Sequence, residues 1–252
     1  MRRADRLGRI LDDLAGNGSV SVTDIAANLE VSPATIRRDL QLLESQRLLS
    51  RTHGGAVAHG VLYELPLRYK VARYQREKVL IAHEAASRVD DGAAVGLTGG
   101  TTTTEVARTL AERHHLTVVT NALNIASELA VRPNLKLVVT GGVARDKSYE
   151  LVGPIAEQSL AGLNLDLVFI GADGVDPIAG LTTHHAMEAH TDRALIERAQ
   201  RVIVVADSSK IGRVAFARIC ELERIHELIT DTGAPATLLE EISQAGVVVT
   251  IV

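Results

Sequence analysis

The spacing of hydrophobic positions predicts three helices within the first fifty residues. An apolar stripe over residues 3–15 predicts the first helix, which Gly16-Asn17-Gly18 should end. A second helix is expected from about residue 23 to residue 29. Ser32-Pro33 marks the start of a third, because serine is a preferred N-cap and proline fits the first helical position. In the third helix, Ile36, Leu40 and Leu43 fall on one face.

Residues 48–57 read as a strand, a Gly-Gly turn and a second strand, which predicts a β-hairpin wing behind the third helix. Three short helices with a tight turn before the third form a helix-turn-helix, so residues 1–57 are predicted to be a winged helix-turn-helix that binds DNA. Asp39 is expected to orient an arginine rather than to contact DNA. The residues expected at the DNA are Ser32, Ala34, Thr35, Arg37, Arg38, Arg51, Thr52 and His53.

The rest of the chain alternates between strand-like and helix-like runs, which predicts an α/β domain over residues 75–252 with a largely parallel sheet. Residues 58–74 are expected to be a linker. The strand-like runs are 93–97, 116–120, 135–140, 167–171, 202–206, 227–230 and 247–252. The helix-like runs are 75–89, 103–113, 122–130, 155–161, 185–198 and 236–245.

Small and polar residues follow five of these strands, and in such folds ligands bind at the carboxyl ends of the strands. The first loop, Thr98-Gly99-Gly100-Thr101-Thr102, leads into a helix whose free N–H groups favour an anion. Lys210 suits a phosphate, and Asp173 and Asp207 suit hydroxyl groups. The sequence therefore predicts a pocket for a phosphorylated polyol or sugar, which Asn121 and Gly141-Gly142 also border.

The composition and charge of the chain limit the classes of partner that it is expected to bind. The net charge is −4, yet residues 1–60 carry eight arginines against seven acidic residues, which is compatible with a DNA-facing N-terminal part. Aromatic residues make up 2% of the chain, which argues against a platform that stacks the bases of single strands. A single cysteine, Cys220, and the lack of a long apolar run favour a cytoplasmic protein without membrane contact.

The run from Val20 to Leu40 resembles the N-terminal signature of the DeoR family of bacterial transcription regulators. Ser32-x-x-Thr35-Ile36-Arg37-Arg38-Asp39-Leu40 is its most characteristic piece, and Arg51-Thr-His-Gly-Gly-Ala56 is similar to the family's wing. Later segments resemble the family's sugar-phosphate-sensing domain, which is related in fold to ribose-5-phosphate isomerase. They include Gly171-Ala172-Asp173-Gly174 and Ala206-Asp207-Ser-Ser-Lys210.

The resemblance implies a regulator, most often a repressor, that binds an operator as an oligomer and responds to a phosphorylated sugar. It assigns pocket roles to Gly100, Thr101, Thr102, Asn121, Gly142, Asp173, Glu188 and Lys210. The chain departs from the family's usual residues at two places in the sensing domain. Thr98-Gly99 stands where the family commonly has Asp-Ser or Asp-Ala, which removes a carboxylate, and His184-His185 stands where it usually has Asn.

Two other functions are compatible with the same residues. Asp173, Glu188 and Lys210 could act as acid and base groups in an aldose–ketose isomerisation, although catalysis behind a winged helix-turn-helix would be unusual. An activator would share the same chemistry. The spacing of His184, His185 and His190 is no recognised metal pattern. We therefore expect a homo-oligomeric, dimeric or tetrameric, DNA-binding regulator of carbohydrate-metabolism genes without catalytic residues, metal or cofactor.

Overall fold

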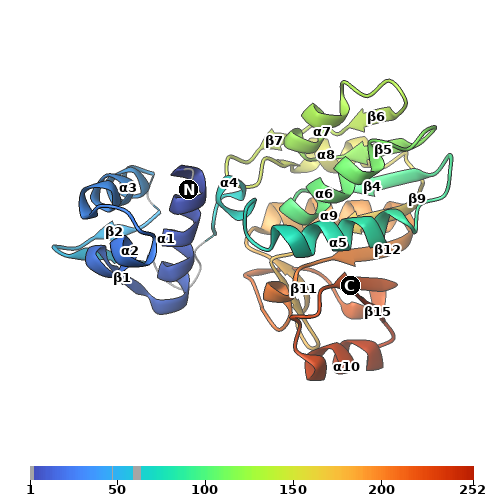
Figure 1. Ribbon diagram of the computed structural model, residues 1–252. Helices are drawn as coiled ribbons and strands as arrows, with labels where there is room; N and C mark the ends of the chain where they lie inside the picture. Colours follow the sequence, from blue (N-terminus) through green and yellow to red (C-terminus); the bar gives the residue numbers. More distant parts are fainter. Residues whose placement is uncertain (1–2, 47, 59–63) are drawn as a thin grey trace. The chain divides into compact units, whose positions relative to one another are not determined.

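A computed structural model describes residues 3–46, 48–58 and 64–252 of the chain. The chain divides after Arg73 into two compact units, each with its own hydrophobic core (Figure 1). The first unit holds the helix-turn-helix and the second holds the α/β domain, so each is described by itself.

The first unit packs three helices against a small antiparallel sheet. The helices are α1 (Arg3–Asn17), α2 (Val22–Asn28) and α3 (Pro33–Ser45). The strands are β1 (Ser19–Ser21), β2 (Ser50–Arg51) and β3 (Gly55–Val57), in the order β1-β3-β2. The apolar stripe predicted for each helix meets in one core, where Ile10, Ile36 and Leu43 are fully buried. The predicted helices and the hairpin wing are therefore confirmed, and β1 adds a third strand to the wing.

Gly55 is required where the wing crosses β1. Ser21 pairs with Gly55, and a Cβ on residue 55 would lie 2.9 Å from the carbonyl carbon of Val20. Any side chain at this position would push the two strands apart. The second glycine of the Gly-Gly turn thus allows β3 to sit between β1 and β2.

The segment that follows the wing packs against the core of the first unit. A short helix, α4 (Leu67–Lys70), follows Leu65, and both Leu65 and Tyr69 belong to the core of this unit. The Tyr69 hydroxyl donates a hydrogen bond to Gln46 Oε1 at 2.6 Å, and Arg73 pairs with Asp12 at 2.9 Å. The segment expected to be a linker, 58–74, is thus partly packed chain, while its residues 59–63 lie outside the described residues.

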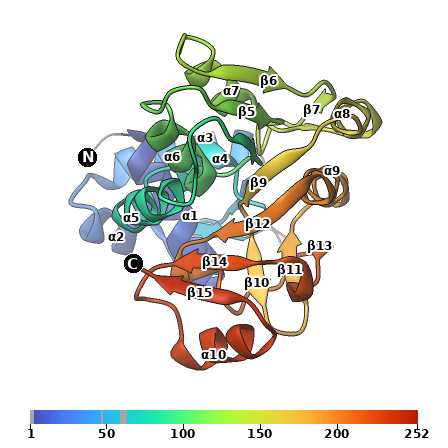
Figure 2. The same cartoon turned by 90° about the vertical axis from the view of Figure 1, so that its right-hand side faces the viewer.

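The second unit is built on a seven-stranded parallel sheet in the order β15-β14-β12-β9-β4-β5-β6 (Figure 2). Its strands are β4 (Ala94–Leu97), β5 (Thr117–Thr120), β6 (Lys136–Val139), β9 (Leu165–Ile170), β12 (Ala199–Val205), β14 (Glu227–Thr230) and β15 (Val248–Ile251). Each was predicted as a strand from a run of apolar residues. The expected fold class, a winged helix-turn-helix followed by a largely parallel α/β domain, is confirmed.

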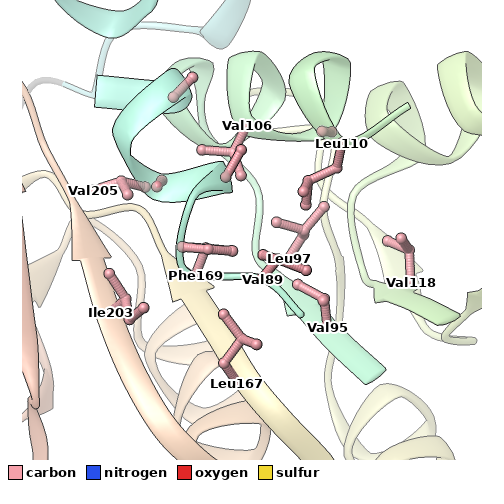
Figure 3. Close-up of a cluster of buried hydrophobic side chains, with 14 of the residues drawn as sticks. Val89, Val95, Leu97, Val106, Leu110, Val118, Leu167, Phe169, Ile203 and Val205 are labelled. Atoms are coloured by element: carbon pink, nitrogen blue, oxygen red, sulfur yellow. The ribbon is translucent and has the colours of Figure 1, made fainter. Parts of the chain in front are cut away.

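Helices cover both faces of this sheet. The helices on one face are α5 (Gln75–Ala86), α6 (Thr101–Leu110) and α7 (Leu123–Leu129), and those on the other are α8 (Pro154–Leu160), α9 (Ala186–Arg198) and α10 (Ala236–Gln244). Figure 3 shows the first layer, where Leu97 of β4 and Phe169 of β9 lie beneath Val106 of α6. The strands have apolar residues on both faces because both faces are covered.

Short antiparallel strands and 3-10 turns lie outside the main sheet, and none of them was predicted. They are the pair β7 (Val143–Ala144) and β8 (Leu151–Val152), the sheet of β10 (Gly174–Asp176), β11 (Gly180–Thr183) and β13 (Ala217–Cys220), and the 3-10 turns η1 (Ser208–Lys210) and η2 (Leu222–Arg224). Cys220 is buried in β13, and burial raises the pKa of its thiol to about 11. Over the described ranges, none of the helices has the length and hydropathy needed to cross a bilayer.

Candidate effector pocket and DNA-binding surface

The predicted recognition helix α3 presents a polar face. Ser32 caps its start, because the Ser32 hydroxyl accepts a hydrogen bond from the Thr35 N–H at 3.2 Å and lies 2.9 Å from the Thr35 hydroxyl. Ile36 is buried, whereas Arg37 and Arg38 are exposed. Ser32 and Thr35 thus fix the first turn, and the two arginines are free of the core. Ala34 is also exposed on this turn.

The wing is tied to the end of α3 through one residue pair. Glu44 Oε1 accepts a hydrogen bond from the Arg51 N–H at 3.0 Å, and the Arg51 guanidinium lies 3.7 Å from Glu44 Oε2. Thr52 and His53, at the tip, are exposed. Arg51 is therefore partly neutralised by Glu44, so it helps to hold the hairpin beside α3 as well as facing outward.

Asp39 orients arginines, but these are not its sequence neighbours Arg37 and Arg38. It is 1% exposed on the inner face of α3, and its carboxylate accepts hydrogen bonds from Arg6 Nε at 2.6 Å and Arg3 Nε at 3.2 Å. Both arginines belong to α1. They can reach Asp39 because it lies three positions after Ile36 and so faces the core rather than the exposed side of α3. Asp39 thus ties the recognition helix to α1.

The pocket region of the second unit lies at a topological switch point. After β4 the chain continues to β5 and β6 on one side, and it later returns to the other side of β4 as β9. The helices that follow β4 and β9 therefore lie on opposite faces of the sheet, and in open α/β sheets ligands bind at the carboxyl ends of the strands at such a point. Both strands end there in loops that sequence analysis had selected, Thr98–Gly100 and Gly171–Asp173.

These two loops are in direct contact. The Gly171 N–H donates a hydrogen bond to the Thr98 hydroxyl at 3.0 Å, and a Cβ on Gly171 would lie 2.9 Å from the Gly99 carbonyl oxygen. Thr98 is fully buried. Gly100 has a φ of +129°, a conformation that favours glycine, and it serves as the N-cap of α6. The small residues of the predicted loop thus let the two strand ends meet.

Helix α6 begins at Thr101, two residues earlier than predicted, and no side chain in the described ranges caps it by a hydrogen bond. The hydroxyls of Thr103 and Thr104 instead donate to the Gly100 carbonyl oxygen, at 3.1 and 2.6 Å. The free N–H groups of the first turn are left facing the loop. Their partial positive charge suits an anion.

Two ion pairs bring together the predicted residues Asp173, Glu188 and Lys210. Asp173 Oδ1 lies 3.9 Å from Lys210 Nζ, and Glu188 pairs with the Arg145 guanidinium. The Thr183 hydroxyl joins the two pairs, since it lies 2.9 Å from Glu188 Oε2 and 3.4 Å from Asp173 Oδ2. The result is a connected group of charges from the loop after β9, from α9 and from η1.

Two more carboxyl groups belong to this group of charges. Glu150, just before β8, and Asp192, one turn after Glu188 on α9, are 5% and 4% exposed. Burial, followed by the charges of Asp192, Glu188 and Asp173, raises the pKa of Glu150 well above its ordinary value. Burial, together with Glu188 and Asp173, does the same for the pKa of Asp192. We refer to Glu150, Asp173, Glu188 and Asp192 as the acidic cluster.

The other predicted pocket residues have different surroundings. Asp207 caps η1 with its carboxylate, which accepts a hydrogen bond from the Ser209 N–H at 3.1 Å. Gly141 donates its N–H to the Ser159 hydroxyl at 3.2 Å, and Gly142, at a φ of +133°, approaches Val152. Asn121 is fully buried after β5. Asp207 and Gly141-Gly142 thus also have local structural roles.

Sequence reasoning missed Arg145, Glu150, Thr183 and Asp192. Arg145 and Glu150 come from the β7–β8 hairpin, for which no pattern was visible. Asp192 could have been found, because a spacing of four residues places it on the same helix face as Glu188. Across the described residues, no group of three or more His, Cys, Asp or Glu side chains is arranged to hold a metal ion.

Comparisons with known proteins agree with this architecture. Residues 6–59 match the DeoR-like helix-turn-helix domain, and residues 73–232 match the DeoR C terminal sensor domain. The HTH-type transcriptional regulator GlpR of Haloferax volcanii is 38% identical over 250 residues, which cover 99% of this chain and 98% of that protein. The glycerol-3-phosphate regulon repressor of Escherichia coli K12 is 30% identical over 240 residues, 95% of each chain.

Among solved structures, ribose 5-phosphate isomerase A of Methanocaldococcus jannaschii is similar at 21% identity and a TM-score of 0.41, over 55% of each chain. The two domain matches lie on the two units of the structure, and the sequence relatives extend over nearly the whole chain. The chain therefore belongs to the DeoR family of transcription regulators.

Proposed function

We propose that the chain is a repressor of carbohydrate-metabolism genes whose operator binding is controlled by a phosphorylated sugar at the switch point of the α/β domain. One observation carries the sensor half of this proposal. The uncapped start of α6 opens from the Gly99-Gly100 loop at the same sheet edge as the ion pairs of Asp173 and Glu188. The names of relatives, among them a glycerol-3-phosphate regulon repressor, fit such an effector.

The phosphate is assigned to the start of α6. The N–H groups of Thr101 and Thr102 point out of the first turn, where a helix start favours an anion. The ammonium of Lys210, which lies in η1, supplies a positive charge for the phosphate. Hydroxyl groups of the sugar are assigned to Asp173, Glu188 and Asn121, which provide acceptors and an amide.

The DNA half of the proposal rests on α3 and the wing. Exposed arginines at the start of a capped helix suit the major groove, and a homo-oligomer would place two such helices on neighbouring half-sites. Ligand binding in the α/β domain would favour one arrangement of the oligomer and so change the operator affinity.

The test is fluorescence anisotropy of the purified full chain on DNA from upstream of its own gene, at fixed salt. Glycerol 3-phosphate, ribose 5-phosphate and fructose 6-phosphate are titrated beside the same compounds without phosphate. We expect one phosphorylated compound to shift the binding curve while its unphosphorylated form does not. Operator binding that no compound changes would contradict the sensor assignment.

Replacing Arg37 or Arg38 by Ala is expected to weaken operator binding by about 1–3 kcal/mol each, because each loses a contact to a base edge or a phosphate. Arg9→Ala is the matched control, since Arg9 is an exposed arginine of α1 in the same unit. Anisotropy at fixed salt measures all three variants. Wild-type affinity in both α3 variants would rule out α3 as the recognition helix.

Lys210→Ala is expected to abolish the effector response, because the ammonium proposed to bind the phosphate is lost and Asp173 is left without this partner. Lys136→Ala, an exposed lysine at the start of β6, is the control. The shift of the operator-binding curve is recorded against effector concentration. A Lys210→Ala protein that responds at the wild-type effector concentration would remove Lys210 from the phosphate site.

A further inference from the structure

Gly99 leaves space that the carboxyl group of Glu150 fills. A Cβ built on residue 99 would lie 2.5 Å from Glu150 Cγ and closer still to its Oε1. Real Cβ atoms do not approach other atoms so closely, so only glycine at position 99 admits the Glu150 side chain in this place. A carboxyl group from the β7–β8 hairpin therefore lies directly on the loop that precedes α6.

The charges around Glu150 favour its neutral form. Of the acidic cluster, Asp173 is paired with Lys210, and Glu188 is paired with Arg145. Glu150 and Asp192 are the two members for which the described residues show no ion pair, and both are almost fully buried. Burial and the neighbouring carboxylates raise the pKa of Glu150, whereas Arg145 opposes this effect only in part. A neutral carboxyl group both donates and accepts hydrogen bonds.

Unsatisfied polar groups gather next to Glu150. Within the described residues, Glu150 Oε2 has no hydrogen-bond partner, and neither does either polar atom of the Asn121 side chain. The two residues are neighbours, because Ala122 forms a bridge with Glu150 and the Asn121 carbonyl accepts a hydrogen bond from the Leu151 N–H at 2.7 Å.

The hydroxyl of Thr140, which directly follows β6 as Asn121 follows β5, is also buried and without a partner in the described ranges. Buried polar side chains almost always have a partner, so these three groups at one sheet edge call for one that the described residues do not supply, such as water or a bound ligand. They lie on the β5 side of the Gly99 loop. The Asp173–Lys210 pair, by contrast, comes from the loops after β9 and β12.

We propose that Glu150, which lies on Gly99, and the neighbouring Asn121 form a neutral subsite that binds hydroxyl groups of the effector and selects among phosphorylated sugars. The inference rests on the proposed function and adds which hydroxyl-binding groups decide specificity. The neutral carboxyl group donates to one hydroxyl oxygen and accepts from another hydroxyl, and the Asn121 amide does the same. An effector without hydroxyls in this position would leave both groups buried and unpaired, which disfavours its binding.

Isothermal titration calorimetry of the full chain tests this subsite. The proteins are the wild type, Glu150→Gln, Glu150→Ala and the control Glu112→Ala, an exposed glutamate behind α6. The probes are glycerol 3-phosphate, ribose 5-phosphate and fructose 6-phosphate. For the compound that binds the wild type most tightly, we expect Glu150→Gln to bind within about threefold, because the amide is neutral and of similar shape. Glu150→Ala should bind at least about tenfold more weakly.

A further variant, Gly99→Ala, keeps the carboxyl group but displaces it, and it should also weaken binding. If Glu150→Ala does not fold, Gly99→Ala and Glu150→Gln together still test the subsite. Infrared difference spectra of the effector-free proteins give a second readout, since a neutral Glu150 adds carboxylic-acid C=O absorbance to that of Asp192, and Glu150→Gln loses the added part.

The possible failures are distinguishable. If no phosphorylated compound binds the wild type, the proposed function fails and the subsite fails with it. If a compound binds the wild type, Glu150→Ala and Gly99→Ala alike, the proposed function stands and the subsite is wrong. Equal weakening in Glu150→Gln and Glu150→Ala, or acid-band absorbance that Glu150→Gln does not lower, would show that Glu150 acts as a carboxylate and would overturn the neutral subsite.

Discussion

Replacing Asp39 by Ala is expected to lower the local stability of α1 and α3 by about 3 kcal/mol. Operator binding should weaken as well, because α3 is the predicted recognition helix. The carboxylate is 1% exposed, and it accepts hydrogen bonds from two arginines. Removing one partner of a buried ion pair costs about 3–5 kcal/mol. The side chain of Arg3 is 58% exposed and adds little, whereas that of Arg6 is 12% exposed and would lose its buried partner. The expected cost therefore lies at the lower end of that range.

Hydrogen exchange followed by mass spectrometry locates the effect. A loss of about 3 kcal/mol corresponds to an exchange rate more than about 100-fold faster in peptides from α1 and α3. Peptides from α5 to α10 should be unchanged, because they belong to the other unit. Asp24→Ala, an exposed position on α2, is the matched control. Wild-type protection of α1 and α3 in Asp39→Ala would show that the buried pair does not hold the recognition helix.

The case of Asp39 shows how far sequence reasoning reaches. The start of α3 was predictable, because Ser32 and Pro33 act on the residues next to them. That Asp39 would orient an arginine was also expected, and the structure confirms it. Which arginine it orients was not predictable, because Arg3 and Arg6 are more than thirty positions away and reach Asp39 only once α1 has packed on α3.

The same distinction holds in the α/β domain. Strands such as β4 and β9 were predictable because most of their residues are buried and apolar, although β9 also contains the exposed Asp166. The hairpin of β7 and β8 has two residues in each strand, too few for a periodic pattern. It nevertheless supplies Arg145 and Glu150. Most of the predicted pocket residues were found from their place after strands, and Glu188 from the family resemblance, whereas Glu150 depends on the missing side chain at Gly99.

Asp192→Asn is expected to make the α/β unit more stable above the ordinary titration range of aspartate, without stabilising it at lower pH. The pKa of Asp192 is raised in the folded protein by burial and by Glu188 and Asp173. A carboxyl group with a raised folded pKa holds its proton more tightly in the folded state than in the unfolded state. Its contribution to stability is therefore complete below the ordinary range of aspartate and is lost as the pH rises toward the folded pKa. Within that window the slope is about 1.4 kcal/mol per pH unit for one proton.

The asparagine carries no titrating proton, so the unfolding temperature of the variant should depend less on pH than that of the wild type. The charge of Asp192 also helps to raise the pKa of Glu150, and this coupling flattens the profile of the variant further. Calorimetric scans from pH 4 to pH 8 compare the wild type, Asp192→Asn and the control Glu197→Gln, an exposed glutamate on the same helix. Parallel profiles for the wild type and Asp192→Asn would mean that Asp192 is ionised in the folded protein. The acidic cluster would then carry one more negative charge than its two ion pairs balance, and a sugar phosphate would bind against that charge.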